Sequence, residues 1–133
     1  MIDEGVFEIA TDSDIVAARQ RGRRIAEQVG FSSSDQVMIA TAISEMARNI
    51  VQYAGPGEIL LSIVSRSRHR GVAIVARDHG PGIPDVARAL QDGYSTSNGL
   101  GMGLPGVRRL MDEFEIRSDV GKGTTVTMKK WAT

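Results

Sequence analysis

The stretch around which the chain is organised is Asp78-His79-Gly80-Pro81-Gly82-Ile83-Pro84. It follows a largely apolar run over residues 72–77, which predicts a buried strand. A carboxylate therefore stands where the strand ends, directly before a turn rich in glycine and proline. Glycine lets a ligand lie close against the main chain, and proline prevents a helix from beginning early. This arrangement suits a small ligand that carries hydrogen-bond donors, and the alternative is an ordinary exit from strand to loop.

The composition is that of an ordinary globular protein. The 133 residues are enough for one domain, over residues 1–133, and 41% of them are hydrophobic and 24% charged. Sixteen Lys and Arg residues balance sixteen Asp and Glu residues, so no net charge attracts nucleic acid or a membrane surface. The absence of cysteine excludes disulfides, thiolate nucleophiles and cysteine-ligated zinc. Because neither a membrane span nor a signal peptide is evident, we expect a cytoplasmic protein.

The first half of the chain predicts one strand and two helices. Residues 5–10 alternate between apolar and polar and predict a short strand, and residues 11–30 predict a helix with an N-cap at its start and a glycine at its end. Four arginines lie on the outer face of this helix: Arg19, Arg21, Arg23 and Arg24. This face is either simply solvated or a surface that binds an acidic partner. A second helix is expected over residues 33–54, begun by a capping box at Ser33.

Two polar residues lie at the edge of the apolar face of the second helix. At about 100° per residue, the apolar residues between positions 39 and 50 gather on one side. Glu45 and Asn49 lie one turn apart at the edge of that side, where a residue that lines a cleft belongs. Asparagine is a poor helix former, so helix propensity does not explain its position. The alternative is a polar flank whose side chains contact one another four residues apart.

The second half predicts two hairpins separated by a glycine-rich loop. Strands are expected over residues 58–64 and 71–77, joined by a basic but exposed loop over residues 65–70. That loop lacks interleaved aromatic residues, so a nucleic-acid site is not expected there. Two helical turns are expected over residues 85–91. The following residues 93–106 are small, polar and dense in glycine, and a long loop of this kind is more often functional than accidental.

A helix from Val107 and strands over residues 114–118 and 124–131 complete the predicted order. Helices and strands are grouped rather than strictly alternating. This order favours an α+β fold with a mixed, mostly antiparallel sheet that is covered on one face by helices.

Two glycine motifs match nucleotide-binding patterns without the context that those patterns require. Gly101-x-Gly103-x-x-Gly106 has the spacing of the dinucleotide fingerprint but follows a polar loop instead of a strand. The segment over residues 121–124 lacks the glycine spacing of a phosphate loop and has no Ser or Thr directly after its lysine. The two histidines have no metal-ligand spacing, so a metal held by protein side chains alone is not expected.

Four other features agree on one kind of site. They are the pair Glu45 and Asn49, the turn after Asp78, the glycine-rich loop that opens a helix, and Thr124 on a late strand. Magnesium prefers oxygen ligands and keeps its waters, so an asparagine carbonyl together with nucleotide phosphates forms a reasonable magnesium site. Backbone amides of a glycine loop at the start of a helix can hold phosphate oxygens.

In this order, the four features resemble the N box, the two glycine boxes and the late threonine of the Bergerat-fold (GHKL) ATPases. These include gyrase, heat-shock chaperone 90, histidine kinases, MutL and the anti-sigma-factor serine kinases. Within this group the chain is similar to the RsbT-type kinases of the bacterial stressosome over nearly its full length. The segments that carry this similarity are residues 14–19, 42–50, 53–55, 93–97 and 106–114. Anti-sigma kinases typically carry a histidine at residues 53–55, so its absence favours the RsbT branch.

The resemblance implies a role for each matched residue of the turn. Asp78 would accept a hydrogen bond from the adenine amino group, and Thr124 and Gly82, with Gly80 and Ile83, would complete the base pocket. A carboxylate in that position disfavours guanine, whose carbonyl oxygen would face it as a second acceptor.

The resemblance also implies roles around the phosphates. Asn49 would ligate magnesium, and Glu45 would act as the general base on the substrate hydroxyl. Arg48 would either lie near the phosphates or pair with Glu45. The lid over the triphosphate would be formed by Gly99, Leu100, Gly101, Met102, Gly103 and Leu104.

The function implied is that of an ATP- and magnesium-dependent serine/threonine protein kinase and partner switch. Its substrates would be STAS-domain stressosome proteins of the RsbS and RsbR types, and once released it would activate a downstream phosphatase or cyclase. Neither nucleic acid nor a membrane is expected as a partner. The alternative is a non-catalytic regulator of anti-sigma type, in which ATP only shapes a binding surface. An ATP-driven conformational machine is disfavoured, because the chain has no room for a second domain.

Overall fold

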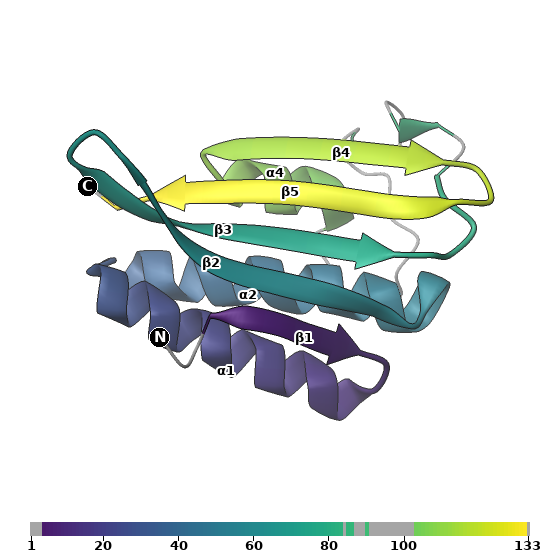
Figure 1. Ribbon diagram of the computed structural model, residues 1–133, viewed down its shortest axis with the longest axis horizontal. Coiled ribbons are helices and arrows are strands. Elements are labelled where there is room, and N and C mark those ends of the chain that lie inside the picture. The colour runs from purple at the N-terminus through teal and green to yellow at the C-terminus, as the bar shows by residue number, and fades with distance from the viewer. Residues whose placement is uncertain (1–3, 84, 87–89, 91–102, 133) are drawn as a thin grey trace.

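The computed structural model of the chain describes residues 4–83, 85, 86, 90 and 103–132. Its elements in chain order are β1 (Gly5–Ile9), α1 (Asp12–Val29), α2 (Ser33–Asn49), the π-helical turn η1 (Ile50–Ala54), β2 (Gly57–Arg66), β3 (His69–Asp78), α4 (Gly103–Leu110), β4 (Glu113–Asp119) and β5 (Gly123–Trp131). The strands form one sheet in the order β1-β2-β3-β5-β4, and all four neighbouring pairs are antiparallel (Figure 1).

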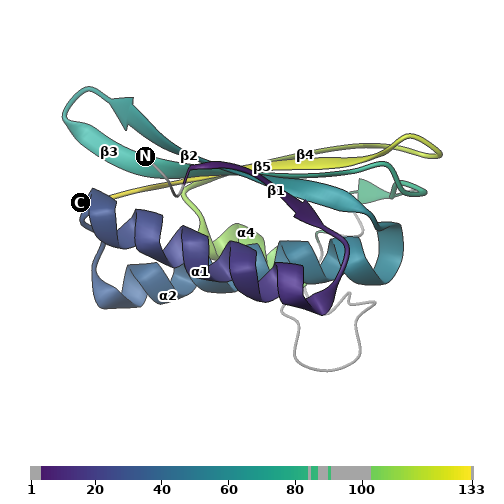
Figure 2. The same cartoon turned by 60° about the horizontal axis from the view of Figure 1, so that its bottom comes forward.

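The three described α-helices lie on one face of this sheet (Figure 2). The predicted α+β fold, with a mostly antiparallel sheet covered on one face, is therefore confirmed. Between the two layers lies a hydrophobic core to which both helices and strands contribute fully buried side chains, among them Ile25, Ile43 and Ile74. Gly22 of α1 allows close packing of the helices, since a Cβ at this position would overlap the side chain of Ile43. No helix in the described ranges is long and apolar enough to cross a membrane.

Local hydrogen bonds fix both ends of α1. Thr11 is the N-cap, and its amide donates to Oδ2 of Asp14 at 3.0 Å while its own side chain accepts from the Asp14 amide. Hydrogen bonds from the amides of Ala10 and Thr11 lower the pKa of the Asp14 carboxyl. Gly30 ends the helix in the left-handed conformation, with φ of 104°. Both predicted ends are confirmed.

The bounds of α2 differ from the prediction at both ends. The N-cap is Ser32, whose hydroxyl accepts from the Asp35 amide at 3.2 Å, so the capping box predicted at Ser33 was wrong by one residue. Three consecutive serines offer equivalent caps, and the sequence does not distinguish among them. At the other end the α-helix stops at Asn49 and continues as η1, because apolar periodicity does not separate an α-helical from a π-helical turn.

The hairpin of β2 and β3 is longer than predicted. The strands pair from Gly57 opposite Asp78 to Arg66 opposite His69, so the loop predicted over residues 65–70 was too long. Backbone pairing continues through polar residues whose composition is typical of a loop. Likewise, α4 begins four residues before the predicted start at Val107. The two helical turns predicted over residues 85–91 lie largely outside the described residues.

Candidate functional site

Asp78 is held at the end of β3 by two backbone amides. Its Oδ1 accepts a hydrogen bond from the Gly80 amide at 2.9 Å and another from the Thr124 amide at 3.2 Å. The first bond closes a turn within the local chain, and the second ties the end of β3 to the start of β5. In the part of the chain that the structure describes, both bonds use Oδ1, which leaves the lone pairs of Oδ2 for a donor from a ligand.

The turn over residues 79–83 packs against the hairpin of β4 and β5. The amide of Ile83 donates to Oγ of Ser118 at 2.7 Å. Gly82 has φ of +78°, and a Cβ at this position would overlap the carbonyl oxygen of Asp119. Only glycine fits both the conformation and the space, so the second glycine of the motif has a structural reason.

Ser118 is a residue of this site that sequence reasoning missed. Its Oγ lies 2.7 Å from Oγ1 of Thr124, its register partner on β5. Ser118 therefore connects the Ile83 amide to the Thr124 hydroxyl and joins the turn after β3 to both strands of the β4–β5 hairpin. A serine in an alternating strand gives no signal of its own, and only its position opposite Thr124 could have identified it.

Glu45 is a nearly buried carboxylate that carries its own counter-ion. It is 5% exposed, and its Oε1 accepts from Nη1 of Arg48 at 2.5 Å, one turn further along α2. The Arg48 side chain remains 35% exposed. Of the two positions expected for Arg48, the structure has the ion pair with Glu45. Hydrogen bonds between ionised groups are shorter and stronger than neutral ones, so this pair holds the carboxylate firmly.

The last turn of α2 and the end of β3 meet at one end of the molecule (Figure 1). Asn49 is half-buried and ends α2, and Ile50 follows it in η1. Gly57 separates Ile50 from Asp78, because a Cβ on Gly57 would lie 2.9 Å from Cγ2 of Ile50 and 3.2 Å from Cβ of Asp78. The chain thus brings the segment that carries Glu45 and Asn49 close to the turn that follows Asp78.

The predicted lid is described only in part. Gly103 begins α4 with φ of +67°, and the Leu104 side chain packs against the core. The other four predicted lid residues lie outside the described residues: Gly99, Leu100, Gly101 and Met102.

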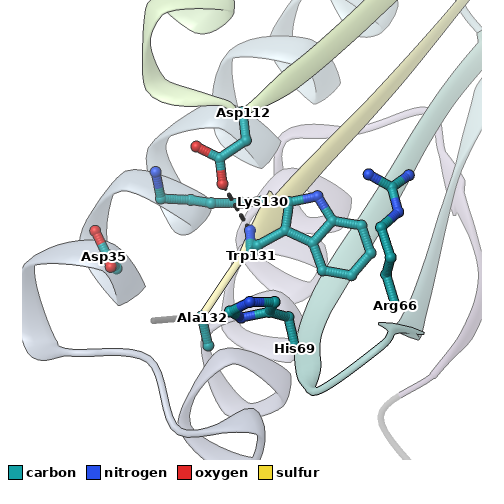
Figure 3. A pocket seen from close by; sticks show the side chains of 7 residues that line it. All are labelled: Asp35, Arg66, His69, Asp112, Lys130, Trp131 and Ala132. Carbon is teal, nitrogen blue, oxygen red and sulfur yellow. Dashed lines mark hydrogen bonds between the residues drawn. The ribbon is translucent and has the colours of Figure 1, made fainter.

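A hollow lies at the other end of β3 from Asp78, about 30 Å away at about 3.3 Å per residue. It has a volume of about 620 Å³ and is lined by the seven residues labelled in Figure 3. Among them, Trp131 donates from its indole to Glu113 and lies under the guanidinium of Arg66. The indole hydrogen bond, followed by the charges of Arg66 and Lys129, lowers the pKa of Glu113. None of the predicted site residues that the structure describes lines this hollow.

Replacing Gly123 should disturb the Asp78 end of β3. Gly123 has φ of +95°, and a Cβ at this position would overlap the carbonyl oxygen of Asp78. Strain and overlap together should lower the free energy of unfolding by about 2–4 kcal/mol in Gly123→Ala. Urea denaturation measures the loss. The matched control is Gly121→Ala, where φ is +81° but no atom of the described residues lies within 4 Å of the added Cβ. Equal losses in the two variants would contradict the close approach to Asp78.

Comparisons with known proteins give relatives that cover most of the chain. The histidine kinase-like ATPase domain family matches residues 9–130. The serine/threonine-protein kinase RsbT of Bacillus subtilis (strain 168) is 53% identical over 131 residues, which cover 98% of each chain. The anti-sigma F factor of Geobacillus stearothermophilus is 33% identical over 108 residues, which cover 77% of this chain and 74% of that protein.

Two solved structures share the fold. The mycobacterial sensor histidine kinase MprB superposes with a TM-score of 0.57 at 14% identity, over 96% of this chain and 97% of that one. The RsbU and RsbW domains of Rv1364c from Mycobacterium tuberculosis give a TM-score of 0.60 at 19% identity, over 94% of this chain and 32% of that one. Together with the family match over residues 9–130, these structures confirm the predicted GHKL-type architecture.

Proposed function

This chain belongs to the histidine kinase-like ATPase family and, within it, to the RsbT-type serine/threonine-protein kinases, and we propose that it transfers the γ-phosphoryl group of ATP to a serine or threonine of a partner protein. One observation carries the proposal. The helix with the nearly buried Glu45 ends beside the strand end where Asp78 is fixed by two amides. The helix with a carboxylate that can take a proton thus ends beside the turn with a carboxylate that can bind a base.

We assign the adenine pocket to the turn after β3. Oδ2 of Asp78 accepts from the adenine amino group, while Oδ1 keeps its bonds to the backbone. Thr124 and Gly82 complete the pocket, together with Gly80 and Ile83. The hydrogen bond from the Ile83 amide to Ser118 fixes this turn against the β4–β5 hairpin and supports the assignment. A base pocket gains specificity when its polar groups are fixed before the ligand binds.

We assign magnesium to Asn49 and the phosphates of ATP. The half-buried amide at the end of α2 offers an oxygen ligand of the type that magnesium prefers. No group of three or more His, Asp or Glu side chains that could hold a metal occurs in the described ranges, so phosphates and water would supply the other ligands. When bound, magnesium neutralises charge on the phosphates. The proposed lid over the triphosphate comprises Gly99, Leu100, Gly101, Met102, Gly103 and Leu104.

Glu45 is the proposed general base. It accepts the proton of the substrate hydroxyl as the hydroxyl oxygen bonds to the γ-phosphorus and the bond from that phosphorus to the bridging oxygen of ADP breaks. The small exposure of Glu45 supports this role, because exclusion of water strengthens electrostatic interactions and limits hydrolysis of ATP.

We propose that the substrates are STAS-domain stressosome proteins of the RsbS and RsbR types, and that the location is cytoplasmic. Once released from them, the kinase would act as a partner switch and activate a downstream phosphatase or cyclase. The identity to RsbT supports this assignment. The second candidate is a non-catalytic regulator in which ATP only shapes a binding surface, and the anti-sigma F factors among the relatives support it.

Transfer of label from γ-labelled ATP to candidate STAS-domain proteins tests the kinase. We expect label on the substrate in the presence of magnesium, and no label on a substrate whose acceptor serine or threonine is replaced by alanine. Absence of transfer by the wild type, under conditions where ATP binds, would refute the kinase. In the non-catalytic candidate, Glu45→Ala would leave every partner affinity and the signalling output unchanged.

A further inference from the structure

Because of the ion pair on α2, the two carboxylate oxygens of Glu45 have different roles. Arg48 donates to Oε1, and a carboxylate needs only one oxygen to accept a proton. Oε2 is therefore the oxygen that can face a substrate hydroxyl. Both partners belong to the same helix and are three residues apart, so the pair forms without any contribution from a ligand or another protein.

The exposures of the two side chains show which partner supports the other. The side chain of Glu45 is 7% exposed and that of Arg48 is 35% exposed, so Arg48 reaches in from the surface to a carboxylate that is almost fully covered. Removing the counter-ion of a buried charge leaves that charge uncompensated and free to take other rotamers. Arg48 also lies in the last turn of α2, where a cation stabilises the helix, and a test must separate the two effects.

We infer that Arg48 is a positioning residue for phosphoryl transfer: it fixes Oε1 of Glu45 so that Oε2 is aimed at the hydroxyl of the substrate. This inference rests on the proposed kinase function. Arg48 itself touches neither the hydroxyl nor the reacting phosphorus. Its effect should therefore appear in the rate of transfer and not in the binding of ATP.

Arg48→Ala should lower kcat by about 30- to 100-fold, because a displacement of a catalytic group by about 1 Å costs roughly that much. The affinity for ATP should stay within about threefold of the wild type, as measured by calorimetric titration. Arg48→Lys, which keeps the charge, should recover part of the lost rate. Added methylguanidinium at low millimolar concentration should also raise the rate of Arg48→Ala, because the partly exposed site of the missing side chain is open to solvent.

The matched control is Arg117→Ala on β4, which removes an exposed guanidinium that lies 3.6 Å from Glu115, and this variant should retain the wild-type kcat. A double variant gives the decisive comparison. In a Glu45→Gln background, Arg48→Ala should cause no further loss of rate, because the residue acts only through Glu45.

Several outcomes would overturn the inference. They are an unchanged or raised kcat in Arg48→Ala, a loss of ATP affinity that parallels the loss of rate, or an additive loss in the Glu45→Gln background. If Arg48 acted only as a cation that stabilises the end of α2, Arg48→Ala would lower the free energy of unfolding and added methylguanidinium would not restore the rate. A wild-type protein that binds ATP but transfers no label would instead refute the kinase function, and this inference with it.

Discussion

Asp78→Asn should abolish ATP binding while the protein stays folded. The asparagine carbonyl can replace Oδ1 and keep the hydrogen bonds from the Gly80 and Thr124 amides. The NH₂ group then stands where Oδ2 was, so a donor faces the amino group of adenine and the hydrogen bond is lost. Loss of a hydrogen bond to a charged group, together with an unsatisfied donor pair, should weaken binding by at least about 100-fold.

Calorimetric titration with ATP measures this loss, and circular dichroism with urea denaturation measures folding. The matched control is Asp119→Asn, the same chemical change at an exposed side chain at the end of β4, and it should bind ATP as the wild type does. If Asp78→Asn instead unfolds the protein, Asp78 serves the turn as a structural residue and the pocket assignment fails. Unchanged ATP affinity would place adenine elsewhere.

Glu45→Gln should strongly reduce the rate of phosphoryl transfer without weakening the binding of ATP. Glutamine has nearly the shape of glutamate and can still accept from Arg48, but it cannot take up the proton of the substrate hydroxyl. General-base catalysis contributes about 10²- to 10⁴-fold to rate, and we expect kcat to fall by that factor. The affinity for ATP should remain within a few fold, since Glu45 is assigned to the substrate and not to the nucleotide.

Single-turnover transfer of label to the substrate measures the rate for Glu45→Gln. The control is Glu27→Gln on the exposed side of α1, where the same change should leave the rate intact. A Glu45→Gln protein with the full rate would mean that another group accepts the proton. Loss of ATP binding in this variant would mean that the pair with Arg48 supports the nucleotide site.

The features that could be predicted from the sequence were those set by local chemistry. Thr11 and Gly30 were predictable as the ends of α1 because helix capping by each residue depends only on the adjacent backbone. The end of β3 at Asp78 was predictable because the apolar run before it and the glycine- and proline-rich turn after it lie within one segment. The pattern of helices and strands then gave the layer arrangement, since apolar residues must face a common core.

The features that could not be predicted depend on contacts across the fold. Ser118 became part of the site through its register opposite Thr124, and strand register is set by the whole hairpin. Backbone pairing extended β2 and β3 through polar residues that are typical of loops. The ion pair of Arg48 with Glu45 was one of two expectations for Arg48, and the sequence alone does not give the side-chain conformation that forms it.

The proposed hydrogen bond between Asp78 and adenine is tested most directly by titrating the wild-type protein with ATP and with GTP at the same magnesium concentration. Guanine places a carbonyl oxygen where adenine has its amino group, so two acceptors would face each other at Oδ2 of Asp78. We predict that ATP binds at least about 100-fold more tightly than GTP. Equal affinities for the two nucleotides would contradict the assignment of Asp78 and of the pocket built around it.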